Sequence, residues 1–104
     1  MASIPAVLRQ RLTQLVVEET PHAVDLRREL HTHPEICYEE VRTSTRIRAA
    51  LAEAGIAHRG GLAGGTGTIA FLAGASDRSV ALRADIDGLP IVEENSCGWK
   101  SRSE

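Results

Sequence analysis

The sequence SVALRADIDGLP, at residues 79–90, is the main indicator of the fold class. Residues 79–84 form a short apolar run with little polar alternation, which is typical of a strand covered on both faces in an α/β sheet. Asp85 and Asp87 follow where this strand gives way to a loop, and open α/β sheets bind ligands at that end of a strand. Carboxylates in this position can bind a hard cation or orient a metal-bound histidine. The alternative interpretation is that both aspartates only shape the turn before Pro90.

A second strand is expected just upstream, at residues 68–73, joined to the first by a turn at residues 74–77. Before it, the glycine-rich residues 64–68, GGTGT, faintly resemble a phosphate-binding loop. Such a loop needs a lysine at its end and a helix after it, whereas a strand follows here. We therefore interpret residues 64–68 as a tight turn into the strand.

The first half of the chain predicts three helices. Residues 4–16 carry one apolar stripe at helical spacing. A second helix is expected to start with Thr20 as its N-cap and Pro21 at its first position, and to end before Pro34. A third covers residues 39–54, with Gly55 as the residue that ends it. Helices followed by strands predict an α/β fold, in which this chain forms one edge of a larger layer.

Composition and charge narrow the possible functions. The chain has 104 residues, 42% of them apolar, which fits at most one globular domain. A formal net charge of -2, with arginines scattered among acidic residues, argues against a nucleic-acid partner. No apolar run is long enough for a membrane span, and residues 1–19 are a poor signal peptide. Cys37 and Cys97 are interpreted as reduced thiols of a cytoplasmic protein.

Three other side chains raise the question of a metal or a nucleophile. His31 and His33 stand two residues apart, which places them about 200° apart on a helix, whereas a helical zinc pair is spaced by four. We favour the interpretation that they lie at a helix C-terminus, where imidazoles interact well with the dipole. Cys97 could act as a nucleophile only with a histidine held beside it, and the sequence does not indicate one.

Several of these segments together resemble one family. Residues 27–35, RRELHTHPE, are similar to the R-R-x-L-H-x-H-P-E opening of amidohydrolases in peptidase family M20, which includes hippurate and N-acyl-amino-acid hydrolases. The segment 38–56 and the Gly-Thr-Gly at 65–67 follow in the same order. Residues 82–91, LRADIDGLPI, resemble the family's L-R-A-D-M-D-A-L-P-I, which a glutamate follows. The resemblance extends over about residues 23–94.

The resemblance implies a fold and a reaction. The fold is an α/β catalytic domain carrying an inserted lid or dimerisation domain, and residues 1–104 are expected to form its N-terminal helices and first strands, incomplete and without the lid. The reaction is hydrolysis of the amide bond of N-acyl amino acids or similar small molecules, with zinc or manganese activating a water. Asp87 matches a supporting aspartate, and Asp85 takes the place of a histidine ligand of related peptidases. A homodimer through the lid is implied for the whole enzyme.

The sequence departs from the family after residue 94. The family continues with H-A-C-G-H-D-x-H, whereas Cys97 is followed by Gly98 and Trp99. We therefore expect these 104 residues to lack the metal ligands and to be inactive alone, as a fragment of an amidohydrolase. Two alternatives remain open: a non-catalytic interaction module derived from the family, and a small metal-binding domain. The second would use His31, His33, Asp85 and Asp87.

Overall fold

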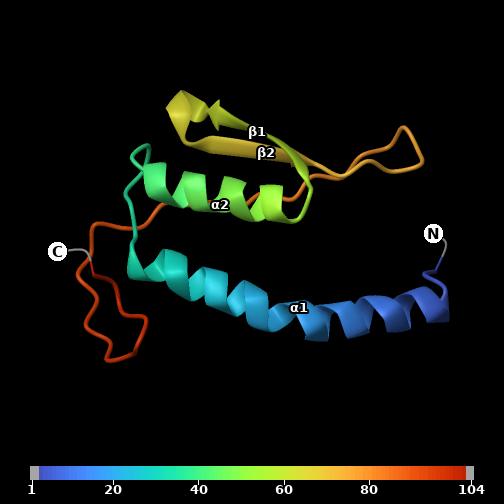
Figure 1. The fold of residues 1–104 in the computed structure, drawn as a ribbon, viewed down its shortest axis with the longest axis horizontal. Helices are drawn as coiled ribbons and strands as arrows, with labels where there is room; N and C mark the ends of the chain where they lie inside the picture. Colours follow the sequence, from blue (N-terminus) through green and yellow to red (C-terminus); the bar gives the residue numbers. More distant parts are fainter. Residues whose placement is uncertain (1–2, 103–104) are drawn as a thin grey trace.

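The computed structural model describes residues 3–102, so the outermost residues of the expected 1–104 unit, 1–2 and 103–104, lie outside it. Two helices precede a hairpin (Figure 1). The elements in chain order are α1 (Ala6–Thr32), α2 (Val41–Glu53), β1 (Ala57–Leu62), the short 3-10 turn η1 (Ala63–Gly65) and β2 (Gly67–Phe71). This is a small mixed α/β arrangement, which agrees with the expected fold class only in its coarse outline.

Helix α1 is continuous where the sequence predicted two helices. It runs through Pro21, which lies inside it. Proline removes one hydrogen bond of a helix and often breaks it. Here Thr20 does not act as a cap, because its hydroxyl donates to the Val16 carbonyl one turn earlier, as in a helix interior. The predicted break at Pro21 was therefore wrong. The predicted end before Pro34 is confirmed, because α1 ends at Thr32 and His33 is its C-cap residue.

Helix α2 and its end follow the sequence closely. The predicted 39–54 corresponds to Val41–Glu53. Gly55 has a φ of 67°, the left-handed region that glycine enters without a steric penalty. Its N–H donates to the Ala52 carbonyl at 3.0 Å, and the Ile56 N–H donates to the Leu51 carbonyl at 2.9 Å. These two bonds form a Schellman motif, which satisfies carbonyls at the helix end.

Strands β1 and β2 pair antiparallel through the turn η1, and α2 packs against both. The register joins Ala57 to Phe71 and Arg59 to Ile69, with an irregularity before Leu62. The prediction of a strand at 68–73 is confirmed in the main, as is the turn before it. Strand β1 was not predicted, because its sequence AHRGGL lacks the β-branched residues of a typical strand.

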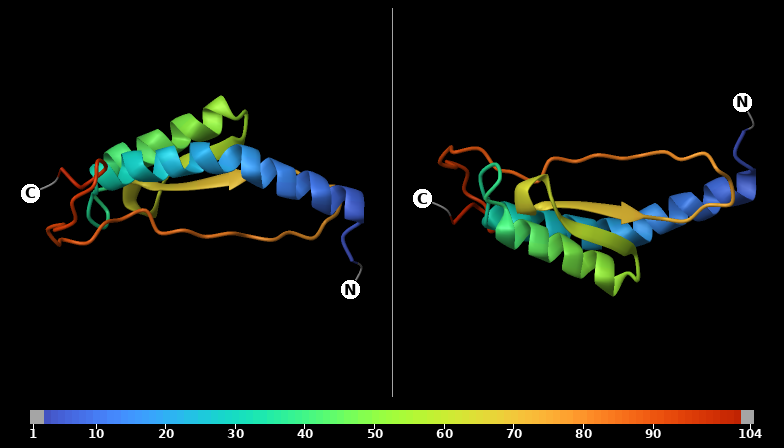
Figure 2. Two further views of the ribbon diagram at one scale, coloured as in Figure 1. Left: turned by 90° about the horizontal axis from the view of Figure 1, so that it is seen from below. Right: turned by 90° about the horizontal axis from the view of Figure 1, so that it is seen from above.

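The strand predicted at residues 79–84 is absent from the described residues. Figure 2 shows the segment after β2 as an extended trace along one side of the molecule. Val80 is 90% exposed and Leu82 fully exposed, so neither face of the segment is covered. A strand needs a neighbour for its N–H and C=O groups, and no described strand pairs with this one. The prediction of a covered strand at residues 79–84 was therefore wrong for the described residues, because this segment pairs with neither β1 nor β2.

Burial is concentrated in polar groups. None of the hydrophobic side chains of residues 3–102 is buried. The four buried residues of the described chain are Glu40, Thr43, Ser44 and Thr66; the first three lie at the start of α2, and Thr66 is hydrogen-bonded to Glu40. Within the same range, neither helix is long and apolar enough to cross a membrane. The apolar side chains of the helices and of the hairpin are therefore only partly covered or exposed, and those that are exposed would need a further surface to be covered.

Candidate functional site

Two segments that are distant in sequence meet beyond the C-terminal end of α1: residues 31–37 and residues 85–93. The Gly88 N–H donates to the Glu35 carbonyl at 2.7 Å. A Cβ atom at position 88 would lie 2.8 Å from the Pro34 Cβ, closer than real contacts allow. Glycine is therefore required for this close approach, which brings the two segments quoted in the sequence resemblance into direct contact.

A groove lies along this junction. Its volume is about 310 Å³, which is at the lower end of the size of small-molecule sites. The residues that line it come from both segments and, with Ser101, from the C-terminal loop: Pro34, Glu35, Ile36, Gly88, Leu89, Pro90, Ile91, Val92 and Ser101.

The two predicted site carboxylates lie just before this groove in the chain. The Asp85 carboxylate forms an ion pair with the Arg83 guanidinium at 2.8 Å. Both side chains are largely exposed, Asp85 at 67% and Arg83 at 86%. Asp87 is also exposed. Burial raises the pKa of the Cys37 thiol, and the negative charges of Asp87, Glu40 and Asp85 raise it further. Of these carboxylates, those of Asp85 and Asp87 remain accessible to solvent at the junction.

Glu35 connects the junction to α2. Its carboxylate accepts the Arg42 N–H at 3.0 Å and the Thr43 N–H at 2.6 Å. These are two of the donors that a helix start leaves without a partner. Burial raises the pKa of the Glu35 carboxyl, but the hydrogen bonds from Thr43 and Arg42 outweigh it, so the pKa lies below its usual value. The glutamate of the HTHPE segment therefore has a structural role, as a cap supplied from outside α2.

Glu40 ties the same helix start to the hairpin. It is only 5% exposed, and its carboxylate accepts a 2.8 Å hydrogen bond from the hydroxyl of Thr66, which is itself buried. The Glu40 backbone N–H and then the Thr66 hydroxyl lower the pKa of this carboxyl. Thr66 lies between η1 and β2, so this buried pair fixes the hairpin turn against α2.

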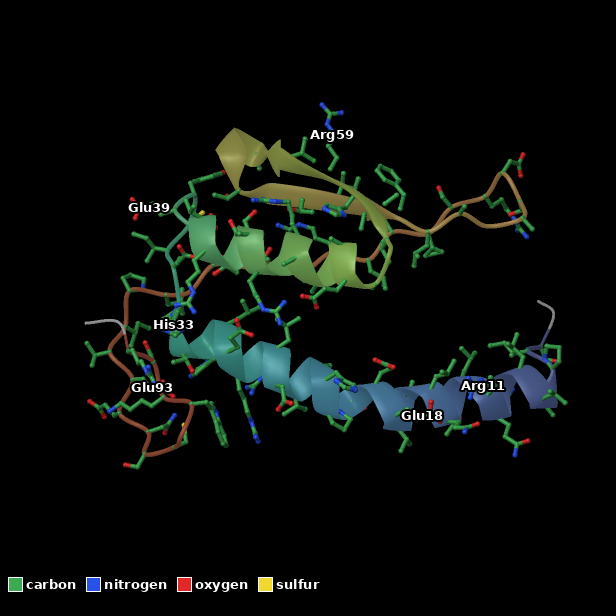
Figure 3. All side chains as sticks on the ribbon, in the orientation of Figure 1. Arg11, Glu18, His33, Glu39, Arg59 and Glu93 are labelled. Atoms are coloured by element: carbon green, nitrogen blue, oxygen red, sulfur yellow. The ribbon has the colours of Figure 1, made fainter. Side chains whose placement is uncertain are left out.

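His31 lies in the last turn of α1, as its interpretation at a helix C-terminus predicted. Its Nε2 atom is 3.0 Å from both carboxylate oxygens of Glu93. The Ser101 N–H donates to the same carboxylate at 2.6 Å. Ser101 first and His31 second lower the pKa of Glu93. Figure 3 shows Glu93 on the loop that folds back toward this end of α1, where His33 also lies.

Further contacts hold the C-terminal loop on α1, and sequence reasoning missed them. The Arg28 guanidinium lies 3.8 Å from the centre of the Trp99 ring, a cation–π contact. The Arg102 N–H donates to the Thr32 carbonyl at 2.8 Å. The Thr32 hydroxyl donates to the Arg28 carbonyl at 2.8 Å and lies 3.3 Å from the Trp99 carbonyl. An isolated Trp in a polar segment was the only available signal, and it does not identify a partner.

The residues of the proposed small metal-binding domain are not brought together. No group of three His, Cys, Asp or Glu side chains within residues 3–102 has the geometry of a metal site. His31 is paired with Glu93, and the Nδ1 atom of the partly buried His33 is enclosed without a hydrogen-bond partner in the described structure. Cys37 and Cys97 are both free thiols. The described residues therefore do not form a metal centre.

Comparison with known proteins finds similarity to hydrolases. The chain is 45% identical over 78 residues to an uncharacterised hydrolase of Staphylococcus haemolyticus. It is 44% and 42% identical over the same length to uncharacterised hydrolases of Staphylococcus aureus and Staphylococcus epidermidis. These matches cover 75% of the chain and 20% of each relative. No protein-family profile and no solved structure matches the chain.

The chain therefore spans about a fifth of the length of the curated relatives that it matches. Three quarters of its residues take part in the match, so the similarity is a property of most of the chain rather than of one short motif. The chain is related to hydrolases through this shared part.

Proposed function

We propose that this chain is the N-terminal part of the catalytic domain of a metal-dependent amidohydrolase of peptidase family M20. The complete enzyme would act in the cytoplasm on the amide bond of N-acyl amino acids or similar small molecules. The observation that carries the proposal is the contact of residues 31–37 with residues 85–93. Both segments resemble motifs that follow one another in that family, and here they line one groove. The similarity to hydrolases, of which the matched segment covers 20%, supports it.

The exposed apolar surface supports the view that further protein completes this domain. Ile69 and Phe71 of β2 are 45% and 59% exposed, and Val80 and Leu82 are more exposed still. A soluble domain covers most such side chains, because burying one apolar side chain stabilises it by roughly 1.5–3 kcal/mol. An added strand beside residues 79–84 and a further layer over the hairpin would supply that cover.

The zinc or manganese of the proposed enzyme does not fit the described residues alone. Asp85 is already paired with Arg83, and a metal site needs at least three protein ligands. We propose that Asp87 and Asp85 act as supporting carboxylates that orient groups supplied by the remainder of the enzyme. The chain by itself is then expected to be inactive.

A chimera tests this proposal. The matching fifth of the Staphylococcus haemolyticus hydrolase is replaced by this chain, and release of amino acid from N-acyl amino acids is measured with zinc or manganese. We expect the chimera to be active, Asp87→Asn to reduce its kcat at least about tenfold, and Asp77→Asn, at an exposed bend, to leave it unchanged. A folded but inactive chimera beside an active relative would refute the proposal, as would full activity of the Asp87→Asn chimera.

The non-catalytic interaction module is the second candidate, and the same exposed apolar residues favour it. It differs in one measurable respect. Such a module is expected to bind a protein partner as a stable 104-residue chain, without metal and without the remainder of a hydrolase. A chimera with Asp87-dependent activity would decide against it.

A further inference from the structure

The first half of α1 extends past α2 and the hairpin (Figure 1). No residue of α1 is buried. Along this half, Val7 is 80% exposed, Leu8 50%, Leu12 45% and Val16 64%. Single exposed apolar residues are common on protein surfaces, but a row of them at helical spacing is typical of an interface.

The charges beside this apolar row have a definite order. Leu8, Leu12 and Leu15 follow one another at spacings of four and three, which places them on one stripe of the helix. Arg11 and Glu18 are seven residues apart, or about two turns, so they lie on the same flank of that stripe. Figure 3 labels both on this part of α1. Among residues 3–102, neither side chain forms an ion pair.

This order makes the surface complementary to itself in one orientation. We propose that a second copy of this chain covers the apolar stripe of α1, with the two helices antiparallel. Leu12 then packs against the partner's Leu15, and Leu15 against the partner's Leu12. The same register places Arg11 opposite the partner's Glu18 and Glu18 opposite the partner's Arg11. A parallel pair would instead bring basic ends together and acidic ends together, which is unfavourable.

The pairing is isologous, so one two-fold axis near the middle of residues 11–18 generates all of these contacts. Arg11, Leu12 and Glu18 are exposed and Leu15 is partly exposed in the described chain, and the pairing does not involve the groove. The inference is independent of the proposed enzymatic function. It also differs from the dimerisation through a lid domain that the family resemblance implies.

Sedimentation equilibrium of the 104-residue chain, from about 1 µM to 1 mM, tests the proposal. We expect a monomer–dimer equilibrium. Arg11→Glu alone, or Glu18→Arg alone, opposes like charges at both contacts, so each is expected to raise the dimer Kd about tenfold. An equimolar mixture of the two variants should recover the affinity of the original chain, because a heterodimer restores opposite charges at both contacts.

Two further variants complete the experiment. Arg27→Glu makes the same charge change on α1 outside the stripe, and it is the matched control, with an unchanged Kd. Leu12→Ala keeps a good helix former and should raise the Kd at least about tenfold. Far-UV circular dichroism verifies that each variant retains its helix. A chain that stays monomeric, a mixture no tighter than its components, or an unchanged Kd for Leu12→Ala would overturn the proposal.

Discussion

Replacing Glu35 removes the cap that joins the 31–37 segment to α2. Its carboxylate accepts two hydrogen bonds, from the Arg42 N–H at 3.0 Å and from the Thr43 N–H at 2.6 Å. Caps of this type stabilise a helix by about 1 kcal/mol, and a second, charge-assisted bond to a partly exposed carboxylate brings the value to roughly 1–1.5 kcal/mol. Glu35→Ala loses both bonds. Glu35→Gln keeps one acceptor oxygen and should lose about half of that stabilisation.

Amide hydrogen exchange measured by NMR at about pH 6 provides the assay, since it reports the opening of individual helix turns. For Glu35→Ala, we expect the Arg42 and Thr43 amides to exchange about tenfold faster, because 1.4 kcal/mol corresponds to a factor of ten. Glu39→Ala, at an exposed neighbouring glutamate with no side-chain bond to α2 in the described structure, serves as the control. Equal exchange rates in the two variants would show that Glu35 does not cap α2.

The same cap predicts a dependence on pH. The pKa of Glu35 in the folded chain lies below its ordinary value of 4.5. A carboxyl with a lowered folded pKa stabilises the fold above its unfolded pKa, and this contribution is lost as the pH falls through the folded pKa. The Thr43 amide chemical shift should therefore titrate with a midpoint below 4.5. A midpoint at or above that value would contradict the geometry.

Three other predictions follow from single contacts. Gly55→Ala places a Cβ at a φ of 67°, so it should destabilise the end of α2 by about 1 kcal/mol and speed amide exchange in its last turn roughly fivefold. Arg28→Gln removes the contact with Trp99, the single tryptophan of the chain, and acrylamide should then quench its fluorescence more strongly; unchanged quenching would mean that the C-terminal loop is held by other contacts. Burial and, after it, the negative charge of Asp87 raise the pKa of the Cys37 thiol. Asp87→Asn should therefore lower this pKa and make alkylation of Cys37 at about pH 8 faster. An unchanged alkylation rate would mean that Asp87 does not lie close to Cys37 in solution.

The accuracy of the sequence predictions followed how local the determining interactions are. Helix α2 and its end at Gly55 were predicted correctly, because the apolar spacing, the glycine and the Schellman hydrogen bonds all lie within a few residues. Strand β2 was also predicted, from its β-branched and aromatic residues. The break at Pro21 was wrong, since a proline costs one hydrogen bond but the residues on both sides favour the helix.

Elements that depend on a distant partner were predicted poorly. Strand β1 has a weak strand sequence and forms because the turn η1 places it beside β2. Residues 79–84 have a strong strand sequence and stay irregular, because they pair with neither β1 nor β2. A strand forms only when a second strand pairs with it, so the composition of one segment indicates where a strand is possible and not where it forms.

By itself, the sequence determined the local elements of this protein: the helical segments, the helix-ending glycine, one strand, and two motif segments with a pair of aspartates. Only the tertiary structure decided which of these meet. It placed Gly88 against Pro34, assigned Glu35 to the start of α2 and paired His31 with Glu93 rather than with His33. The physical reason is range: helix periodicity and caps act over one or two turns, whereas these contacts join groups more than fifty residues apart or across a change of chain direction.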